Sequence, residues 1–282
     1  MIHILTCGTS LLTNHDFWNR CGIEFLAGQI IPPKVIASAL GLEEFNLKDS
    51  NEMSKWADQL KLVEFELPKV KFLSAELTSL FSAPLGGETL PEHMVLLASD
   101  TTDQIGLAAA MIHAKILTAN GGEIRYAANP EALSANLENL PEKGRLVQVV
   151  LQEGLDPTKP KNFATGIGSI AGTLSQLMRL KRIWAFHLSG GFKASIPAIT
   201  HVLGVARTCG QDVFAQVCFD AALDTENSGI LVPILGFIER DLKAAQRTKK
   251  AQPLGTFLHD TPGMLEAVEL MFRAPRQPNL EE

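Results

Sequence analysis

Runs of apolar residues alternate with amphipathic segments along most of the chain. Short apolar runs bounded by turn residues predict buried strands, and the longer segments between them repeat apolar residues at helical spacing. This alternation predicts an α/β protein with a mostly parallel sheet and helices on both of its faces. The predicted strands cover residues 2–7, 93–98, 123–127, 146–151, 183–188, 213–219 and 230–235.

The last two predicted strands follow each other without a helix, which predicts an antiparallel hairpin at a sheet edge. We assign residues 1–238 to the α/β domain and residues 239–282 to a helical C-terminal extension. The predicted helices cover residues 34–47, 51–62, 70–81, 103–119, 167–179, 194–208, 237–250 and 257–272.

Composition excludes several classes of protein. Of the 282 residues, 46% are hydrophobic and 20% charged, which suits a chain with a folded core. No apolar run reaches the roughly 18 residues of a membrane helix, and Met1–Thr6 lacks the basic region of a signal peptide. A net charge of −6 argues against binding of long nucleic acid. The four cysteines lack CxxC spacing, which is typical of free thiols in a cytoplasmic protein.

Three polar loops that contain glycine or hydroxyl residues follow predicted strands. They are Gly8–Asn14, Ser99–Thr102 and Ser189–Lys193. In an open α/β sheet, ligands bind beyond the carboxyl ends of the strands, where the strand order reverses. The sequence therefore predicts one ligand site built from three loops that are far apart in the chain.

The first and third loops carry the stronger chemistry. Gly8 lets a ligand approach the backbone closely, and Thr9 and Ser10 offer hydroxyls and amides to phosphate or ribose oxygens. Ser189–Lys193 places two glycines before a lysine at a helix start, which combines exposed amides, the helix dipole and a point charge. The structural alternatives are an ordinary strand-to-helix turn for the first loop and a solvated lysine for the third.

Other patterns have structural explanations. Asp100 or Thr102 would serve as the N-cap of the helix predicted from residue 103. Gly166–Gly172 resembles a dinucleotide-binding fingerprint but follows no convincing strand, so we attribute it to packing of a helix against the sheet. His187 lies within an apolar strand and is interpreted as a core histidine or as one that supports a neighbouring site residue. The histidines and cysteines show no metal-ligand spacing, and no metal site is expected.

Three motifs together resemble the CRISPR-associated Rossmann-fold (CARF) domains. They are Ile4–Asn14 (ILTCGTSLLTN), Leu96–Thr101 (LLASDT) and Leu188–Ala194 (LSGGFKA), and Ile230–Pro233 is similar to the strand that closes such domains. The resemblance covers roughly residues 1–238. It implies a Rossmann-like sheet and a homodimer that binds a cyclic oligoadenylate, the second messenger of type III CRISPR systems, across its two-fold axis.

Many members of this family carry a C-terminal nuclease or DNA-binding effector, and those signatures are not found here. This departure favours the members whose CARF domain is itself the enzyme, the ring nucleases. In their reaction a ribose 2′-hydroxyl attacks the adjacent phosphorus without a metal or other cofactor and leaves a 2′,3′-cyclic phosphate. On this resemblance Ser10 and Lys193 would be catalytic. Ser10 would orient the attacking hydroxyl or contact the phosphate, and Lys193 would stabilise charge on the phosphoryl oxygens.

The resemblance also implies a set of ligand-binding residues around these two. Two-fold symmetry pairs equivalent contacts, which favours a ring with an even number of nucleotides. Cyclic tetra-adenylate is therefore the first choice and cyclic hexa-adenylate the second. No general base is evident in the sequence. The implied binding residues are Gly8, Thr9, Leu11, Asn14, Ser99, Asp100, Thr101, Thr102, Ser189, Gly190, Gly191 and Phe192.

Two other functions stay open. The chain could be a non-cleaving sensor that relays ligand binding to a partner or to DNA through its C-terminal helices, with the basic run at residues 243–250 as the sole support. It could also be an ordinary nucleotide-binding α/β enzyme that uses the same turns. Binding without cleavage would favour the sensor. Stabilisation by a mononucleotide but not by a cyclic oligoadenylate would favour the ordinary enzyme.

Overall fold

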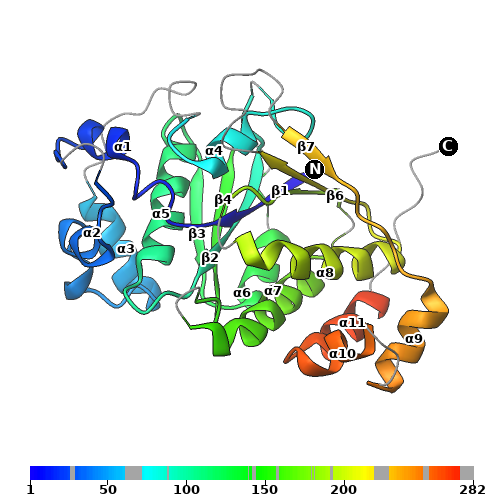
Figure 1. Ribbon diagram of the computed structural model, residues 1–282. Helices are drawn as coiled ribbons and strands as arrows, with labels where there is room; N and C mark the ends of the chain where they lie inside the picture. Colours follow the sequence, from blue (N-terminus) through cyan, green and yellow to red (C-terminus); the bar gives the residue numbers. More distant parts are fainter. Residues whose placement is uncertain are drawn as a thin grey trace.

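A seven-stranded, mostly parallel sheet forms the centre of the described chain, and helices cover both of its faces (Figure 1). This arrangement confirms the predicted α/β fold class. The computed structural model describes residues 1–25, 29–60, 72–87, 89–138, 140–141, 144–156, 159–178, 180, 182–190, 193–218, 229–249 and 254–273.

The sheet has the strand order β3-β4-β2-β1-β5-β6-β7. The central strand β1 pairs in parallel with β2 on one side and with β5 on the other, so the strand order reverses between β1 and β5. Among the described strands, β7 alone is antiparallel, and its pairing with β6 confirms the predicted edge hairpin. The strands are β1 (Ile2–Cys7), β2 (His93–Ser99), β3 (Glu123–Ala127), β4 (Leu146–Gln152), β5 (Trp184–His187), β6 (Val213–Cys218) and β7 (Gly229–Val232).

Two hydrophobic cores lie on the two faces of the sheet. Side chains of a strand alternate between its faces, so Leu5 and Cys7 join one core and Ile2 and Ile4 join the other. The first core is covered by α1 (His15–Arg20), α2 (Pro33–Ala39), α3 (Ser50–Gln59), α4 (Ala75–Leu80) and α5 (Ile105–Thr118). The second is covered by α6 (Pro130–Glu138), α7 (Phe163–Leu177) and α8 (Ile196–Thr208).

The C-terminal helices pack onto this second layer. They are α9 (Glu239–Arg247), α10 (Leu254–Asp260) and α11 (Met264–Arg273), and α11 contacts α7 and α8. Leu242, Leu258 and Val268 are buried in the same core as α7 and α8. The single helix predicted over residues 257–272 is wrong, because the chain turns between α10 and α11 at Gly263, whose φ is +75°.

Glycines on α7 bring that helix close to its neighbours. A Cβ at Gly166 would lie 2.6 Å from the Cα of Leu155, and one at Gly168 would lie 1.7 Å from the carbonyl oxygen of Pro262. At Gly172 no atom lies within 4 Å of such a Cβ. The first two glycines therefore serve packing. Their contacts are with the loop after β4 and with the turn between α10 and α11, rather than with the sheet as predicted.

Several element boundaries differ from the prediction. The helix expected at residues 34–47 ends at Ala39 and is followed by a 3-10 turn, Leu42–Glu44. The short helices α1 and α6 were not predicted. Parts of five predicted elements, at residues 61–62, 70–71, 179, 219 and 250, lie outside the described residues. The longest described helices, α5 and α7, lack the length and apolar character that a membrane crossing requires.

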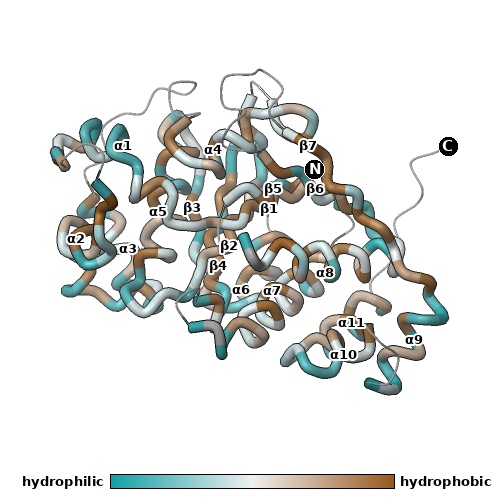
Figure 2. Tube along the Cα trace, in the orientation of Figure 1, coloured by the Kyte–Doolittle hydropathy of each residue, from teal (hydrophilic) through white to brown (hydrophobic). Residues whose placement is uncertain are grey.

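An apolar strip follows the open edge of the sheet. Figure 2 shows hydrophobic colour along β7 and the segment that leads to α9. Ile230, Leu231, Leu235 and Ile238 in this strip are each at least 50% exposed. An exposed apolar edge of this kind is able to pair with another chain.

Candidate functional site

The three predicted loops lie at one edge of the sheet. They follow β2, β1 and β5, which are adjacent strands. The parallel register pairs Cys7 with Ala98 of β2 and Leu5 with His187 of β5, so the three strands end side by side. The strand order reverses between β1 and β5, and in sheets of this type ligands bind beside such a reversal, at the carboxyl ends of the strands.

The first loop is anchored to a buried carboxylate on α4. Glu76 is 1% exposed, and its Oε1 accepts a hydrogen bond of 2.7 Å from the backbone N–H of Gly8. The hydroxyl of Ser10 donates to Oε2 over 2.6 Å. Hydrogen bonds to a charged acceptor are about twice as strong as neutral ones. Glu76 therefore fixes both the backbone and the candidate catalytic hydroxyl of this loop.

The third loop meets the same carboxylate. A Cβ at Gly190 would lie 2.2 Å from Oε1 of Glu76, so a larger residue at this position would require Glu76 or the loop to move. The carbonyl oxygen of Gly190 accepts a 2.7 Å hydrogen bond from the hydroxyl of Thr6 at the end of β1. The loops after β1 and β5 are thus joined through Glu76 and Thr6.

A polar chain continues behind Glu76 into the core. His113 on α5 is fully buried, and its Nε2 lies 3.7 Å from Oε2 of Glu76 and 2.8 Å from the hydroxyl oxygen of Ser74. Its Nδ1 lies 2.7 Å from the carbonyl oxygen of Ala109 and therefore carries a proton. Burial, with a smaller effect from Glu76, raises the pKa of the Cys7 thiol well above its usual value. Cys7 is accordingly a packed, protonated thiol rather than a nucleophile.

The second loop is held by different partners from those predicted. The N-cap role predicted for Asp100 or Thr102 is wrong, because the N-cap position of α5 is Gln104, and the first N–H groups of the helix donate to the side chains of Asp103 and Thr101. A carboxylate oxygen of Asp100 lies 2.6 Å from the ammonium of Lys48. Thr102 donates to a carboxylate in the connection between β4 and α7. Ser99, the first residue of this loop and the last of β2, is 6% exposed.

A pocket of about 600 Å³ lies between the first and second loops. The pocket is lined by threonine hydroxyls and apolar side chains, and the exposed Lys34 of α2 also lines it. A mainly apolar wall with a few polar groups is typical of small-molecule sites. The lining residues are Thr9, Thr13, Ile31, Pro32, Pro33, Lys34, Ile36, Thr101, Thr102, Asp103 and Ile105.

Three of the implied binding residues have structural roles here. Leu11 is fully buried in the core beneath α1. The side chain of Asn14 caps α1 by accepting from the N–H of Asp16, and its amide donates to the carbonyl of Leu73. The hydroxyl oxygen of Ser189 accepts a 2.6 Å hydrogen bond from the N–H of Cys218. These side chains shape the loops, and their polar groups are engaged within the protein.

Lys193 is exposed and begins the 3-10 turn Lys193–Ser195, which leads directly into α8. Its position at the start of that helix agrees with the predicted placement. The two residues before it, Gly191 and Phe192, lie outside the described residues.

The buried His187 belongs to a histidine pair inside the sheet. Its ring stacks on that of His3, with Nε2 2.9 Å from Nδ1 of His3. Gln216 donates to its Nδ1 over 3.2 Å. Burial lowers the pKa of His3 to about 4 and that of His187 to about 3, so both rings are neutral at neutral pH. His187 is a core histidine, as predicted.

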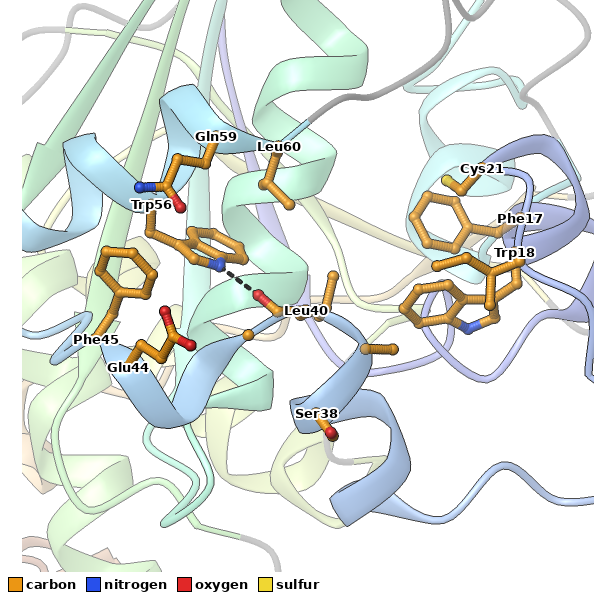
Figure 3. A pocket seen from close by; sticks show the side chains of 13 residues that line it. Phe17, Trp18, Cys21, Ser38, Leu40, Glu44, Phe45, Trp56, Gln59 and Leu60 are labelled. Atoms are coloured by element: carbon orange, nitrogen blue, oxygen red, sulfur yellow. Dashed lines mark hydrogen bonds between the residues drawn. The ribbon is translucent and has the colours of Figure 1, made fainter.

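A second cavity, of about 460 Å³, lies between α1, α2 and α3 (Figure 3). Trp56 and Phe45 line one side of it and Trp18 and Phe17 the other, and the indole N–H of Trp56 donates to the carbonyl of Leu40. None of the predicted site residues lines this cavity.

Glu76 is the site residue that sequence reasoning missed. The available signal was a single carboxylate in the helical stretch 73–81, whose other polar residues, Ser74, Thr78 and Ser79, carry only hydroxyls. Within the described ranges, His, Cys, Asp and Glu side chains nowhere form a group of three that could hold a metal ion.

No protein-family model matches the chain, and a search of curated proteins finds no significant relative. The fold itself defines the class: an α/β protein with a Rossmann-like, mostly parallel sheet whose order reverses beside β1.

Proposed function

We propose that the chain binds a cyclic oligoadenylate across the two-fold axis of a homodimer and cleaves it as a metal-independent ring nuclease. The products would be linear oligoadenylates with 2′,3′-cyclic phosphate ends. The main support is the meeting of the β1 and β5 loops beside the reversal of strand order, with Ser10 held in a fixed orientation there. The sequence resemblance supplies the ligand class.

In the proposed reaction a ribose 2′-oxygen forms a bond to the adjacent phosphorus, and the bond from phosphorus to the 5′-oxygen breaks. The 2′-hydroxyl loses its proton and the 5′-oxygen gains one. Holding the attacking oxygen in line with the breaking bond can lower the activation barrier by about 7 kcal/mol or more. The ammonium of Lys193 would stabilise the charge on the phosphoryl oxygens, and one such donor is worth about 3–4 kcal/mol.

The pocket between the first and second loops suits part of the same ligand. Its apolar residues from α2 offer a surface for an adenine ring, and Thr9 and Thr101 offer hydroxyls to polar atoms. Lys34 adds a cationic group at the pocket for a phosphate. The pocket residues Thr9, Thr101 and Lys34 would thereby contribute to binding without taking part in the chemical step.

The test is incubation of the full-length protein with cyclic tetra-adenylate and cyclic hexa-adenylate, with and without EDTA, followed by chromatography of the products. We expect linear products with cyclic phosphate ends in both conditions. Lys193→Ala should lower the cleavage rate by about 100-fold or more. Lys243→Ala is the matched control, because that lysine is exposed on α9 and pairs with Glu239. Rings that stay intact with the wild-type protein over hours would refute the ring-nuclease activity.

A non-cleaving sensor is the second candidate, and the position of α8 favours it. This helix begins just after Lys193, and it contacts α11. A ligand that moved the third loop would therefore act directly on a helix that supports the C-terminal helices. The sensor predicts ring binding without turnover, together with a ligand-dependent change in amide exchange of α11. A DNA mobility shift that stays negative with and without ligand would exclude DNA as its target.

A further inference from the structure

The hydrogen bond between Ser10 and Glu76 determines what Ser10 can offer a ligand. A serine hydroxyl has one proton to donate and two lone pairs that accept, whereas a carboxylate accepts only. The 2.6 Å contact between the Ser10 hydroxyl and Oε2 of Glu76 uses that proton. Ser10 is half-buried, and toward a ligand it presents lone pairs.

Glu76 is held so that this arrangement persists. Its other oxygen accepts from the N–H of Gly8 over 2.7 Å, and its side chain is almost completely buried. Gly190 packs so closely on the carboxylate that an added Cβ would lie 2.2–2.4 Å from three of its atoms. A carboxylate confined in this way cannot turn aside and release the Ser10 proton to a ligand.

We infer that Glu76 is a positioning residue that makes Ser10 a hydrogen-bond acceptor, so that Ser10 contacts a ribose hydroxyl of the ligand rather than a phosphate oxygen. The inference rests on the proposed function. Phosphate oxygens are acceptors and would meet a lone pair of Ser10, which is repulsive, whereas a 2′-hydroxyl can donate to it. A 2′-hydroxyl that donates to Ser10 is also held in one orientation, with its own lone pairs free to face the phosphorus.

The inference selects one of the two roles that the sequence leaves open for Ser10. It also predicts that the protein recognises ribose through this residue, so that rings without 2′-hydroxyls bind more weakly. The discrimination should depend on the carboxylate of Glu76, which gives the test a readout that a purely structural role would not change.

The experiment measures the affinity of two uncleavable rings by calorimetry. Both are cyclic tetra-adenylates with methylene groups in place of the 5′ oxygens, and one lacks its 2′-hydroxyls. We expect the wild-type protein to bind the hydroxyl-bearing ring more tightly than the hydroxyl-free ring. The ratio of the two affinities should be roughly 5- to 10-fold for each hydrogen bond that the hydroxyl-free ring cannot form. In Ser10→Ala this ratio should fall close to 1. Ser54→Ala, an exposed serine on α3, is the control and should keep the wild-type ratio.

Glu76→Gln reverses the polarity of the contact. The amide oxygen can still accept from Gly8, and the amide nitrogen then donates to Ser10, which turns the serine proton toward the ligand. The ratio should again fall, while the hydroxyl-free ring keeps its affinity. A wild-type ratio in folded Glu76→Gln would overturn the role of Glu76. If this variant does not fold, Ser10→Ala still decides whether Ser10 contacts a ribose hydroxyl.

Two outcomes separate the inference from the function on which it rests. Wild-type ratios in folded Ser10→Ala would overturn the inference and leave the proposed function standing. If the folded wild-type protein bound neither ring, the proposed function and this inference would both be refuted.

Discussion

Replacement of Gly190 by alanine tests the junction of the β1 and β5 loops. The added Cβ would lie 2.2 Å from Oε1, 2.3 Å from Cδ and 2.4 Å from Cγ of Glu76. Real Cβ contacts of this kind do not occur, so the Glu76 side chain or the Gly190 backbone has to move. The backbone of Gly190 does not have a positive φ. Alanine is therefore compatible with the local conformation, and the effect of the substitution is steric.

The expected loss follows from the contacts that Glu76 makes. Its hydrogen bonds from Gly8 and Ser10 are bonds to a charged group, worth about 1.5–3 kcal/mol each. Loss of both hydrogen bonds would lower the free energy of unfolding by at most about 6 kcal/mol. Overpacked sites usually relax, so that the destabilisation is about 1–3 kcal/mol. We expect Gly190→Ala to lower the free energy of unfolding by about 2–4 kcal/mol.

Urea unfolding, followed by far-UV circular dichroism, measures this change. Gly172→Ala on α7 is the matched control, because its Cβ would meet no atom within 4 Å. Alanine in a helix interior is about 0.5–1 kcal/mol more favourable than glycine, so this control should be stabilised. If Gly190→Ala were as stable as Gly172→Ala, Glu76 would not be confined as described.

Three further predictions concern other parts of the molecule. Gly168→Ala should destabilise the protein by about 2 kcal/mol or more relative to Gly172→Ala in urea unfolding, because its Cβ would meet a backbone oxygen in the turn between α10 and α11. His3 and His187 have folded pKa values below the usual 6.5, so the unfolded state binds more protons below that pH. Stability should therefore be greatest above about pH 6.5, and the free energy of unfolding should fall by about 1.4 kcal/mol per histidine at about pH 5.5. The urea midpoint of His3→Gln should change less with pH over this range than the midpoint of the wild-type protein. Iodoacetamide should leave Cys7 unmodified in the folded protein and alkylate it after unfolding, as mass spectrometry of peptides would show, because burial raises the pKa of its thiol.

The sequence predicted those features that depend on local pattern and on general rules of topology. Buried parallel strands such as β1, β2 and β4 are largely apolar runs, which the sequence shows directly. The edge strands β3 and β7 are less buried, and the turn residues that bound them indicated where they lie. The meeting of three loops at one sheet edge follows from parallel topology and needs no knowledge of side-chain contacts.

Features that depend on tertiary contacts were missed. The role of Glu76 arises because α4 packs against the ends of β1 and β5, and Ser10 is 66 residues away from it in the chain. Asp100 has good capping chemistry, but Lys48 from a distant segment binds it, and Asp103 and Thr101 accept from the first N–H groups of α5 instead. In both cases the local sequence allows several partners, and the neighbours brought in by folding select one.

The central position of β1 matters for the synthesis of the protein. This strand is made before its neighbour β5, which is about 180 residues further along the chain. At typical translation speeds of 5–20 residues per second, roughly 10–40 s separate the two strands. Until β5 is made, the edge of β1 that it will cover has no partner in the sheet, and an unpaired apolar edge of this kind can pair with another chain.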